Sequence, residues 1–359
     1  MIEHRFGQAE AGTLGIEEEL FFVRGADCAT APLFTAIFGE GEEGIVPELF
    51  ECFVETRTPV VAGPVEALVE LRRLREAVAA RAAEHGALVH GAGSHALARG
   101  LGQPIVPARR YEALVGRLGW RMFQQLVCGL HVHVSMPDAG SALRAFEAVV
   151  PWLPVLLALS ANSPFAGGKA TGRRSERAER LLKMPTGGTP PLLPDWDAWQ
   201  AATGRDSTRR HWDAWPRPEY GTLEVRVMDM QTDVRRSAGF AAIVQALALT
   251  VPGTVKARSR SPQTRGFTVP GIVRARPYDR ALYERRRREA AVRPPDPAEV
   301  EALAAAVEPH LDGEARGLAR LVLEGRPEAE RQLEVAAADG IPAVPRDVVA
   351  RTLGINPLD

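Results

Sequence analysis

Acidic side chains occur inside segments that otherwise have the pattern of buried β-strands. Residues 13–23, TLGIEEELFFV, carry Glu17 and Glu19 ahead of an apolar run. Residues two apart on a strand point to the same face, roughly 7 Å apart, so these two carboxylates repel each other unless a cation lies between them. A charged group in an apolar strand must be paired, so the fold has to supply a partner for these acids.

The same pattern recurs further along the chain. A second strand, predicted over Leu49–Val54, is bracketed by Glu48 and Glu55, and a third, 221–228 (GTLEVRVM), carries Glu224 at its centre. A single E-x-E pair is more typical of a solvated edge strand. Recurrence on separate strands favours a shared partner instead, and a divalent metal ion is a common partner of clustered carboxylates.

Two histidines lie on another predicted strand, residues 126–136 (LVCGLHVHVSM). Its apolar positions alternate, so His131 and His133 share the opposite face. Several carboxylates with one imidazole, His131, suit Mg²⁺ or Mn²⁺ better than zinc. An H-x-H pair also fits the zinc site of a hydrolase, although no H-E-x-x-H motif follows. A packed core residue is the alternative for each histidine, and for His133 the choice between a supporting group and a packing residue stays open.

Cations that could hold a phosphate accompany these acids. Arg226 shares a strand face with Glu224 and Thr222, which makes it the best-placed candidate. The segment TGRRSER and its continuation supply Arg173, Arg174, Arg177 and Arg180. An exposed, charged helix start is the alternative explanation for that segment.

Strands and helices follow one another in irregular order, which favours an α+β fold over a doubly wound one. Predicted helices run from Gly63-Pro64 to Gly86, with an apolar stripe, from Ser141 to Ser160 and from Ser237 to Leu249, and a short strand is predicted at Leu88–His90. Beyond Pro252, Arg and Pro dominate, and an Ala/Glu/Arg-rich helical tail follows. We expect a catalytic core over 1–253, and over 254–359 a connection and a helical region packed on that core.

Composition excludes several classes of partner. The chain has 44 basic and 45 acidic residues and a formal net charge of -1, so it has no global field for nucleic acid or an anionic membrane. The apolar stretch Val149–Leu159 is too short to span a bilayer. Three cysteines without a C-x-x-C pair suit a reducing interior, and the N-terminus lacks an apolar signal region. We therefore expect a cytoplasmic protein.

Motif-like segments elsewhere in the chain predict no further ligand site. No phosphate-binding P-loop is present. Gly91–Ala96, GAGSHA, fits G-x-G-x-x-A, but Pro104 and Pro107 disrupt the helix that should follow, so we expect a turn. The run Arg285–Arg288 is flanked by glutamates, which favours a solvated face over nucleic-acid binding.

Five segments, in order and with suitable gaps, resemble the carboxylate–amine ligase, or type 2 glutamate–cysteine ligase, family of the glutamine synthetase superfamily. They are TLGIEEEL (13–20), PELFECFVETRTPV (47–60), CGLHVHVSM (128–136), LSANSPFAGGKATGRRSER (159–177) and RPEYGTLEVRVMDMQT (217–232). The resemblance covers about residues 13–250. It implies a curved antiparallel sheet that forms a funnel, with helices packed on its outer face.

The resemblance also implies cofactors, substrates and residue roles. Arg226 would face a phosphate, Arg177 would contact a phosphate or a glutamate carboxylate, and both would be catalytic; with Arg173 they would contact ATP. The implied metal ligands, for two or three Mg²⁺ or Mn²⁺ ions, are Glu17, Glu19, Glu48, Glu55, His131 and Glu224. The implied substrates are small molecules, glutamate and an amine such as cysteine, and a homodimer fits the family.

The implied reaction phosphorylates the substrate carboxylate with ATP, and the amine then attacks the acyl phosphate. Three departures bear on substrate choice. Trp215 stands where the family usually has an arginine, the segment Pro190–His211 is short, and a C-terminal Asn/Trp/Arg motif is barely recognisable around Tyr278–Tyr283. A metal-dependent hydrolase using His131 and His133, or an inactive homologue that serves as a binding module, are the alternatives.

Overall fold

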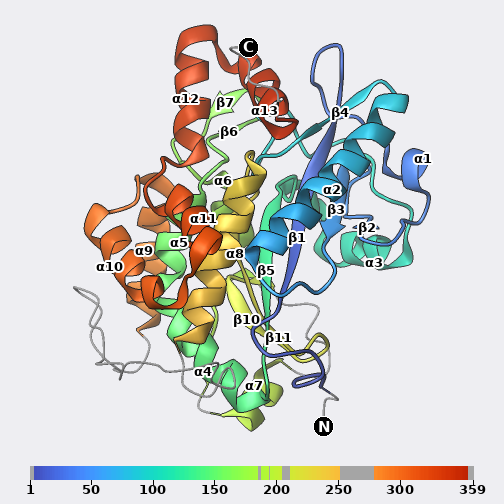
Figure 1. Ribbon diagram of the computed structural model, residues 1–359. Helices are drawn as coiled ribbons and strands as arrows, with labels where there is room; N and C mark the ends of the chain where they lie inside the picture. The colour runs from blue at the N-terminus through green and yellow to red at the C-terminus, as the bar shows by residue number, and fades with distance from the viewer. Residues whose placement is uncertain (1–3, 185–186, 194, 204–210, 251–278, 355–359) are drawn as a thin grey trace.

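A seven-stranded sheet forms the centre of the molecule, and every pair of neighbouring strands in it is antiparallel (Figure 1). The computed structural model describes residues 4–184, 187–193, 195–203, 211–250 and 279–354. The strand order is β10 (Ala214–Arg217), β11 (Thr222–Asp229), β5 (Gly129–Ser135), β1 (Leu14–Arg24), β3 (Phe53–Arg57) and β2 (Ile45–Val46), with β4 (Ala87–His90) also paired to β1. The predicted α+β class is confirmed.

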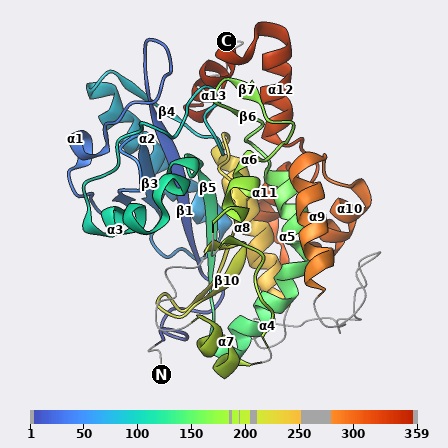
Figure 2. The ribbon, with the colours of Figure 1, turned by 180° about the vertical axis from the view of Figure 1, so that it is seen from behind.

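Two long helices, α2 (Pro64–Glu84) and α8 (Val234–Leu249), cover one face of this sheet (Figures 1 and 2). Ile16 of β1 and Val132 of β5 point into the apolar core on that side. Glu18 points the same way and is fully buried, and Arg75 of α2 donates to both of its carboxylate oxygens at 2.7 and 2.8 Å. The central acid of the E-E-E run is therefore held by a helix, while its neighbours face the opposite side.

The prediction from the sequence placed strand β3 too early in the chain. The prediction was Leu49–Val54, but the strand runs over Phe53–Arg57 and contains Glu55. The backbone of the preceding residues bonds elsewhere: Leu49 accepts from Val106, and Glu51 accepts from Leu33 and Phe34. The local pattern could not reveal those distant partners.

The apolar stripe of α2 is only partly as predicted. Leu71, Leu74 and Val78 are buried, whereas Val65 and Leu68 are half-buried. Proline at the first position of the helix replaces an N–H that would have no partner there. Leu88–His90 was confirmed as part of a strand.

A nearly continuous helical stretch, Ala139–Ser160, packs in the core as α4 (Ala139–Val149), the short 3-10 turn η2 (Val150–Trp152) and α5 (Leu153–Ser160). It is long and apolar enough to cross a membrane, but 78% of its most apolar window is buried inside the protein, as in a core helix. Pro151 and Pro154 lie in first turns, where proline costs no hydrogen bond.

The C-terminal helices share the main core. α9 (Arg280–Val292), α10 (Pro297–Val307) and α11 (Gly313–Leu323) contribute to the cluster that contains Phe240 of α8 and Leu156 of α5. α12 (Glu328–Asp339) and α13 (Val344–Thr352) pack as a pair beside the loop after β4. The predicted boundary at residue 253 lies outside the described residues, so the two-part division stays a prediction.

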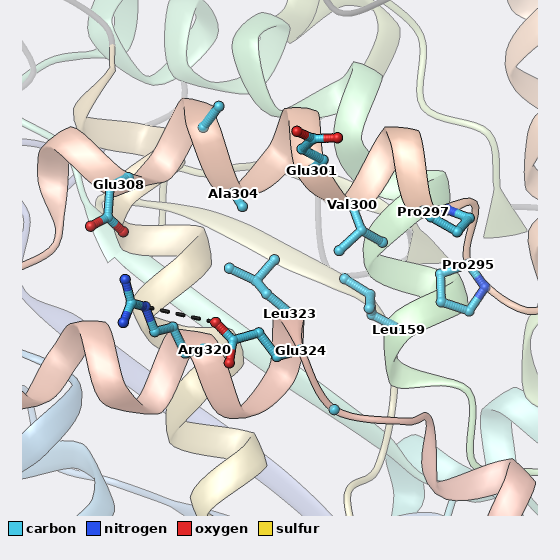
Figure 3. A pocket seen from close by; sticks show the side chains of 12 residues that line it. Leu159, Pro295, Pro297, Val300, Glu301, Ala304, Glu308, Arg320, Leu323 and Glu324 are labelled. Atoms are coloured by element: carbon cyan, nitrogen blue, oxygen red, sulfur yellow. Dashed lines mark ion pairs between the residues drawn. The ribbon is translucent and has the colours of Figure 1, made fainter.

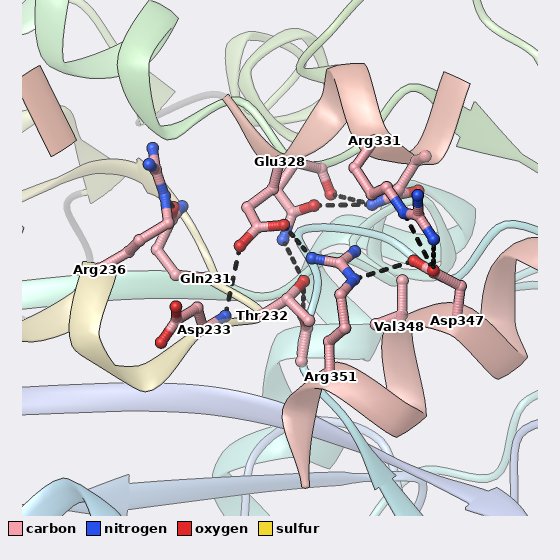
Figure 4. A network of polar contacts seen from close by, with 12 residues as sticks. Gln231, Thr232, Asp233, Arg236, Glu328, Arg331, Asp347, Val348 and Arg351 are labelled. Carbon is pink, nitrogen blue, oxygen red and sulfur yellow. Dashed lines mark hydrogen bonds and ion pairs between the residues drawn. The ribbon is translucent and has the colours of Figure 1, made fainter. Parts of the chain in front are cut away.

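An ionic network ties α12 and α13 to the core (Figure 4). Glu328 and Asp347 flank Arg351, and Glu328 also accepts from the backbone N–H of Asp233. Arg331 donates to Asp347 at 2.7 Å. Close by, Gln332 donates to Asn162, so the C-terminal pair reaches the loop that ends α5.

The remaining elements are short. They are α1 (Phe34–Phe38), α3 (Arg109–Leu118), η1 (Gly119–Gln124), β6 (Phe165–Ala166), β7 (Lys169–Ala170), α6 (Glu176–Leu182), β8 (Gly187–Gly188), α7 (Trp196–Thr203), β9 (His211–Trp212), η4 (Glu308–His310) and η5 (Ile341–Ala343). The segment Gly91–Ala96 is an irregular, bent loop that no helix follows directly. The departure around Tyr278–Tyr283 lies partly outside the described residues.

Candidate active site

The sheet face opposite α2 and α8 gathers the acids that the sequence singled out. Glu17 and Glu19 both point to this face of β1 and both contact His131 of β5, which pairs with Glu17 in the strand register. Glu17 Oε2 lies 3.0 Å from His131 Nδ1, and Glu19 Oε1 lies 3.7 Å from His131 Nε2. The predicted common face of these three residues is present.

Glu55 lies opposite Glu19 on β3, and the charge of Glu48 acts on both of these acids. Glu55 pairs with Glu19 across β1 and β3 and is 4% exposed. Burial and the charge of Glu17 raise the pKa of Glu55 well above its usual value. Burial and the charge of Glu19 raise the pKa of Glu48 to about 7. Mutual repulsion of these carboxylates shows that the described side chains do not fully neutralise the group.

Glu224 of β11 is the most strongly paired of the acids. Its Oε2 accepts from Arg217 Nη1 at 2.6 Å and from Trp215 Nε1 at 2.9 Å, and its Oε1 accepts from Arg226 Nη1 at 3.1 Å. Burial alone would raise the pKa of Glu224, but Arg217 and Arg226 hold it well below its usual value. Glu224 is therefore held in its ionised form, and its Oε2 already accepts two hydrogen bonds.

His133, left open by the sequence, faces the same group. Its Nε2 lies 3.8 Å from Glu17 Oε1 and 3.9 Å from Glu224 Oε1, and one ligand atom from each of these three residues lies within 4.8 Å of the others. Its Nδ1 lies 2.9 Å from Thr222 Oγ1. A hydrogen bond at one ring nitrogen leaves the other available, as in many metal-bound histidines.

Three buried nitrogen atoms on this face have no hydrogen-bond partner among the described residues: His131 Nε2, His133 Nε2 and Arg226 Nε. A buried polar atom without a partner costs about 1–3 kcal/mol, so such atoms mark where a ligand is expected. Burial and the charge of Arg226 lower the pKa of His131, which favours its neutral, metal-binding form. With the surrounding carboxylates, this donor set fits Mg²⁺ or Mn²⁺.

Arg177 is placed beneath the sheet face. It is 2% exposed, and its guanidinium donates to the carbonyls of Val227 and Arg226, where the β11–β5 register shifts. A Cβ at Gly129 would come within 2.2 Å of Arg177, so the close approach requires glycine at that position. In this arrangement Arg177 supports the backbone that carries Arg226.

Arg173 is separate from these side chains. Its guanidinium pairs with Glu176 at 3.3 Å and Glu179 at 3.8 Å, both on α6. Of the other arginines in that segment, Arg174 pairs with Glu330 and Arg180 with Glu176. The contact of Arg173 with ATP stays a prediction.

A buried hydrogen-bond cluster around Asp229, not foreseen from the sequence, joins the segments 159–177 and 217–232. Asp229 accepts from Ser163 Oγ at 2.6 Å, from Ser175 Oγ at 2.8 Å and from the backbone N–H of Asn162 at 2.9 Å. Ser175 also caps α6 by accepting from Ala178. These hydrogen bonds fix the end of β11 close to the charged face.

Three further residues at this face were also missed. Arg57 pairs with Glu55 at 2.5 Å and with Glu17 at 3.5 Å. Tyr220, 46% exposed, meets the ring of His133 edge-on. His211 of β9 lies close enough that burial and Arg226 lower its pKa to about 3. Of these three, only Arg57 could have been predicted from the alternation of side chains along a strand, because it follows Glu55 by two residues.

A separate cavity of about 600 Å³ lies between α10 and α11 (Figure 3). Its walls are mainly apolar, with Leu159, Val300 and Leu323 among them. None of its lining residues belongs to the charged face, so the cavity and the candidate active site are different places.

Comparisons with known proteins agree on a family. The family model described as glutamate-cysteine ligase family 2 matches residues 13–347. The glutamate–cysteine ligase of Haloferax volcanii is 34% identical over 260 residues, which cover 68% of this chain and 73% of the relative. A homologue from Rubrobacter xylanophilus is 36% identical over 260 residues, covering 69% and 72%.

Two solved structures share the fold. The glutamate–cysteine ligase of Francisella tularensis, in complex with AMP, superposes with a TM-score of 0.62 at 14% identity, over all of this chain and 91% of that one. The bifunctional glutathione synthetase of Pasteurella multocida gives 0.67 at 12% identity, over 95% of this chain, which spans only about half, 52%, of that protein. These similarities give the hydrolase alternative no support.

Proposed function

The chain belongs to glutamate-cysteine ligase family 2 and is an ATP-dependent carboxylate–amine ligase, and we propose that its carboxylate substrate is glutamate and that its amine is an amino acid such as cysteine. The observation that carries the proposal is the one face that gathers Glu17, Glu19, Glu55, His131 and Glu224 with Arg226. Small-molecule substrates fit such a ligase.

The metal roles follow from the donor set. Glu17, Glu19, Glu48, Glu55, His131 and Glu224 would hold Mg²⁺ or Mn²⁺, and His133 joins them as a candidate because its Nε2 faces two of the carboxylates. The metal would supply positive charge at the phosphate oxygens during transfer. Arg217 and Arg226 keep Glu224 ionised and in place.

In the proposed reaction an oxygen of the substrate carboxylate attacks the terminal phosphorus of ATP, and ADP leaves. The amine nitrogen then attacks the acyl carbon, the amine gives up a proton, and inorganic phosphate leaves with the former carboxylate oxygen. Arg226 would contact the transferred phosphate through its buried Nε, which has no hydrogen-bond partner among the described residues. Arg177 would act indirectly, by fixing the backbone under Arg226.

ADP release with Mg²⁺, ATP, glutamate and a panel of amines that includes cysteine tests this proposal. We expect turnover with at least one pair, and folded protein that is inactive with every pair would contradict it. That second result, combined with measurable ATP binding, would support the binding-module alternative.

A single substitution tests the proposed metal site. We expect Glu19→Gln to lower turnover about a hundredfold or more, because it removes a charged ligand while keeping the side-chain volume. Glu70→Gln, which changes a half-buried acid of α2 that pairs with Arg73, is the matched control. Equal rates in Glu19→Gln and wild type would refute the metal assignment.

The remaining expectations are proposals of the same kind. The three cysteines are free and buried, which fits the proposed cytoplasmic location. A homodimer is proposed from the family resemblance alone, and sedimentation of the purified protein would test it.

A further inference from the structure

Arg57 reaches between two of the proposed metal ligands. It pairs with Glu17 across the β1–β3 register and follows Glu55 by two residues on β3, so all three side chains share one face. Arg57 Nε lies 2.5 Å from Glu55 Oε1 and 3.5 Å from Glu17 Oε1. One guanidinium nitrogen thus occupies the position of a cation shared by both acids.

The burial of the three side chains is unequal. The side chain of Arg57 is 44% exposed, whereas those of Glu55 and Glu17 are 5% and 16% exposed. A half-exposed arginine has a long, flexible side chain that can move its guanidinium out into solvent. The two carboxylates, in contrast, are fixed on their strands. Of the three groups, the guanidinium is therefore the one that can leave.

A divalent ion held by these same oxygens would lie a few ångströms from the guanidinium. Like charges at such a separation repel each other strongly, even where nearby water screens them in part. Glu55 and Glu17 cannot keep the guanidinium in this position and bind a metal through the same oxygens without that penalty. The guanidinium and a divalent metal therefore compete for the same two carboxylate oxygens.

We propose that Arg57 is a built-in counter-ion of the carboxylate group, which holds Glu17 and Glu55 together in the metal-free protein and which a divalent metal must displace. The proposal rests on the proposed function for the identity of the metal ligands. Arg57 is then a positioning residue that lowers the affinity for free metal, and its displaced guanidinium moves into solvent, to which the Arg57 side chain is already 44% exposed.

Metal affinity without nucleotide tests the displacement. We expect Arg57→Met, which keeps the stem and removes the charge, to bind Mn²⁺ about tenfold or more tightly than wild type, measured by electron paramagnetic resonance of free Mn²⁺. Arg73→Met is the matched control, because Arg73 is 58% exposed and pairs with Glu70 at 2.9 Å on α2. Unchanged or weaker binding in Arg57→Met would overturn the proposal.

A second measurement follows metal binding in the wild-type protein, and a variant is used only to assign one signal. The Nε–H signal of Arg57, assigned by its loss in Arg57→Lys, is followed by ¹⁵N NMR as Mg²⁺ is added. We expect this signal to shift or broaden as the pair with Glu55 breaks. A signal that stays constant up to saturation with Mg²⁺ would show that Arg57 keeps its place.

The outcomes distinguish this inference from the proposed function. Wild type that binds Mn²⁺ and turns over ATP, with an unaltered affinity in Arg57→Met, would sink only the role of Arg57. Wild type that binds no divalent ion would count against both. Turnover plays no part in either readout for Arg57.

Discussion

Trp215 shows how one residue's neighbours decide the meaning of a substitution. Its place in the sequence suggested a lost cation near the substrate. In the structure Trp215 is buried and donates to Glu224, and Arg217, two residues on, donates to the same oxygen and stacks over the indole at 4.8 Å. The cation at Glu224 is therefore present, supplied by another position of β10.

As a proposed metal ligand, Glu48 is expected to make metal binding pH-dependent. Burial and the charge of Glu19 raise the pKa of Glu48 to about 7, and a carboxylate must lose its proton to bind a metal. The protonated fraction grows as the pH falls below 7, so we expect the affinity for Mn²⁺ to be about tenfold weaker at pH 6 than at pH 8. Titration calorimetry at both pH values measures it.

The control for this prediction is Glu48→Gln, which cannot ionise. Its Mn²⁺ affinity should be weaker than that of wild type and should vary less between the two pH values. A wild-type affinity that is the same at pH 6 and pH 8 would mean that Glu48 is not among the ligands.

At the scale of elements, α9 is fixed to the edge of the sheet by a buried ion pair. Arg287 Nε and Nη2 donate to the two oxygens of Asp213 at 2.6 and 2.9 Å, and Tyr283 donates to the same carboxylate at 2.7 Å. The carbonyl of Asp213 accepts from the N–H of Arg226. The expected solvated face of Arg285–Arg288 was wrong for Arg287, because Arg287 lies with Tyr283 and Ala291 on the face of α9 that packs against the core.

We expect Arg287→Met to lower the free energy of unfolding by about 3–5 kcal/mol, since it leaves the Asp213 carboxylate buried without its counter-charge. Urea unfolding followed by circular dichroism measures the change. Arg288→Met, at a 65% exposed neighbour, should change stability by less than about 0.5 kcal/mol. Similar values for the two variants would argue against a buried pair in solution.

At the scale of the whole molecule, the chain before and after residue 253 shares one core. Phe240 of α8 belongs to the same apolar cluster as Val307, Ala319 and Val322 of the C-terminal helices. A Cβ at Gly239 would come within 2.4 Å of the Leu318 carbonyl, so α8 and α11 are in direct backbone contact. The C-terminal region is part of what closes the core.

We therefore expect the fragment 1–253 not to fold alone, because it would expose the apolar side of α8 to water. Thermal unfolding of the purified fragment should show no cooperative transition, whereas the full chain should show one. A cooperative, soluble fragment would instead show that the core predicted over 1–253 folds without the helical region that follows it.

Local periodicity was enough to find much of the charged face. Alternation in β1, β5 and β11 placed Glu17 with Glu19, His131 with His133, and Glu224 with Arg226, because the side-chain period of a strand is set by its own backbone. The strand face on which Glu17 and Glu19 lie, and the one on which Glu224 lies, could thus be assigned before any contact between strands was known.

Only the tertiary structure decided which faces meet and which groups neutralise them. Contacts with residues distant in the sequence set the start of β3, the pairing of Arg57 with Glu17, the approach of His133 Nε2 to Glu224 and the burial of Arg287. Strand register and helix docking set those distances, and the pattern of one segment carries no information about the segment that packs against it.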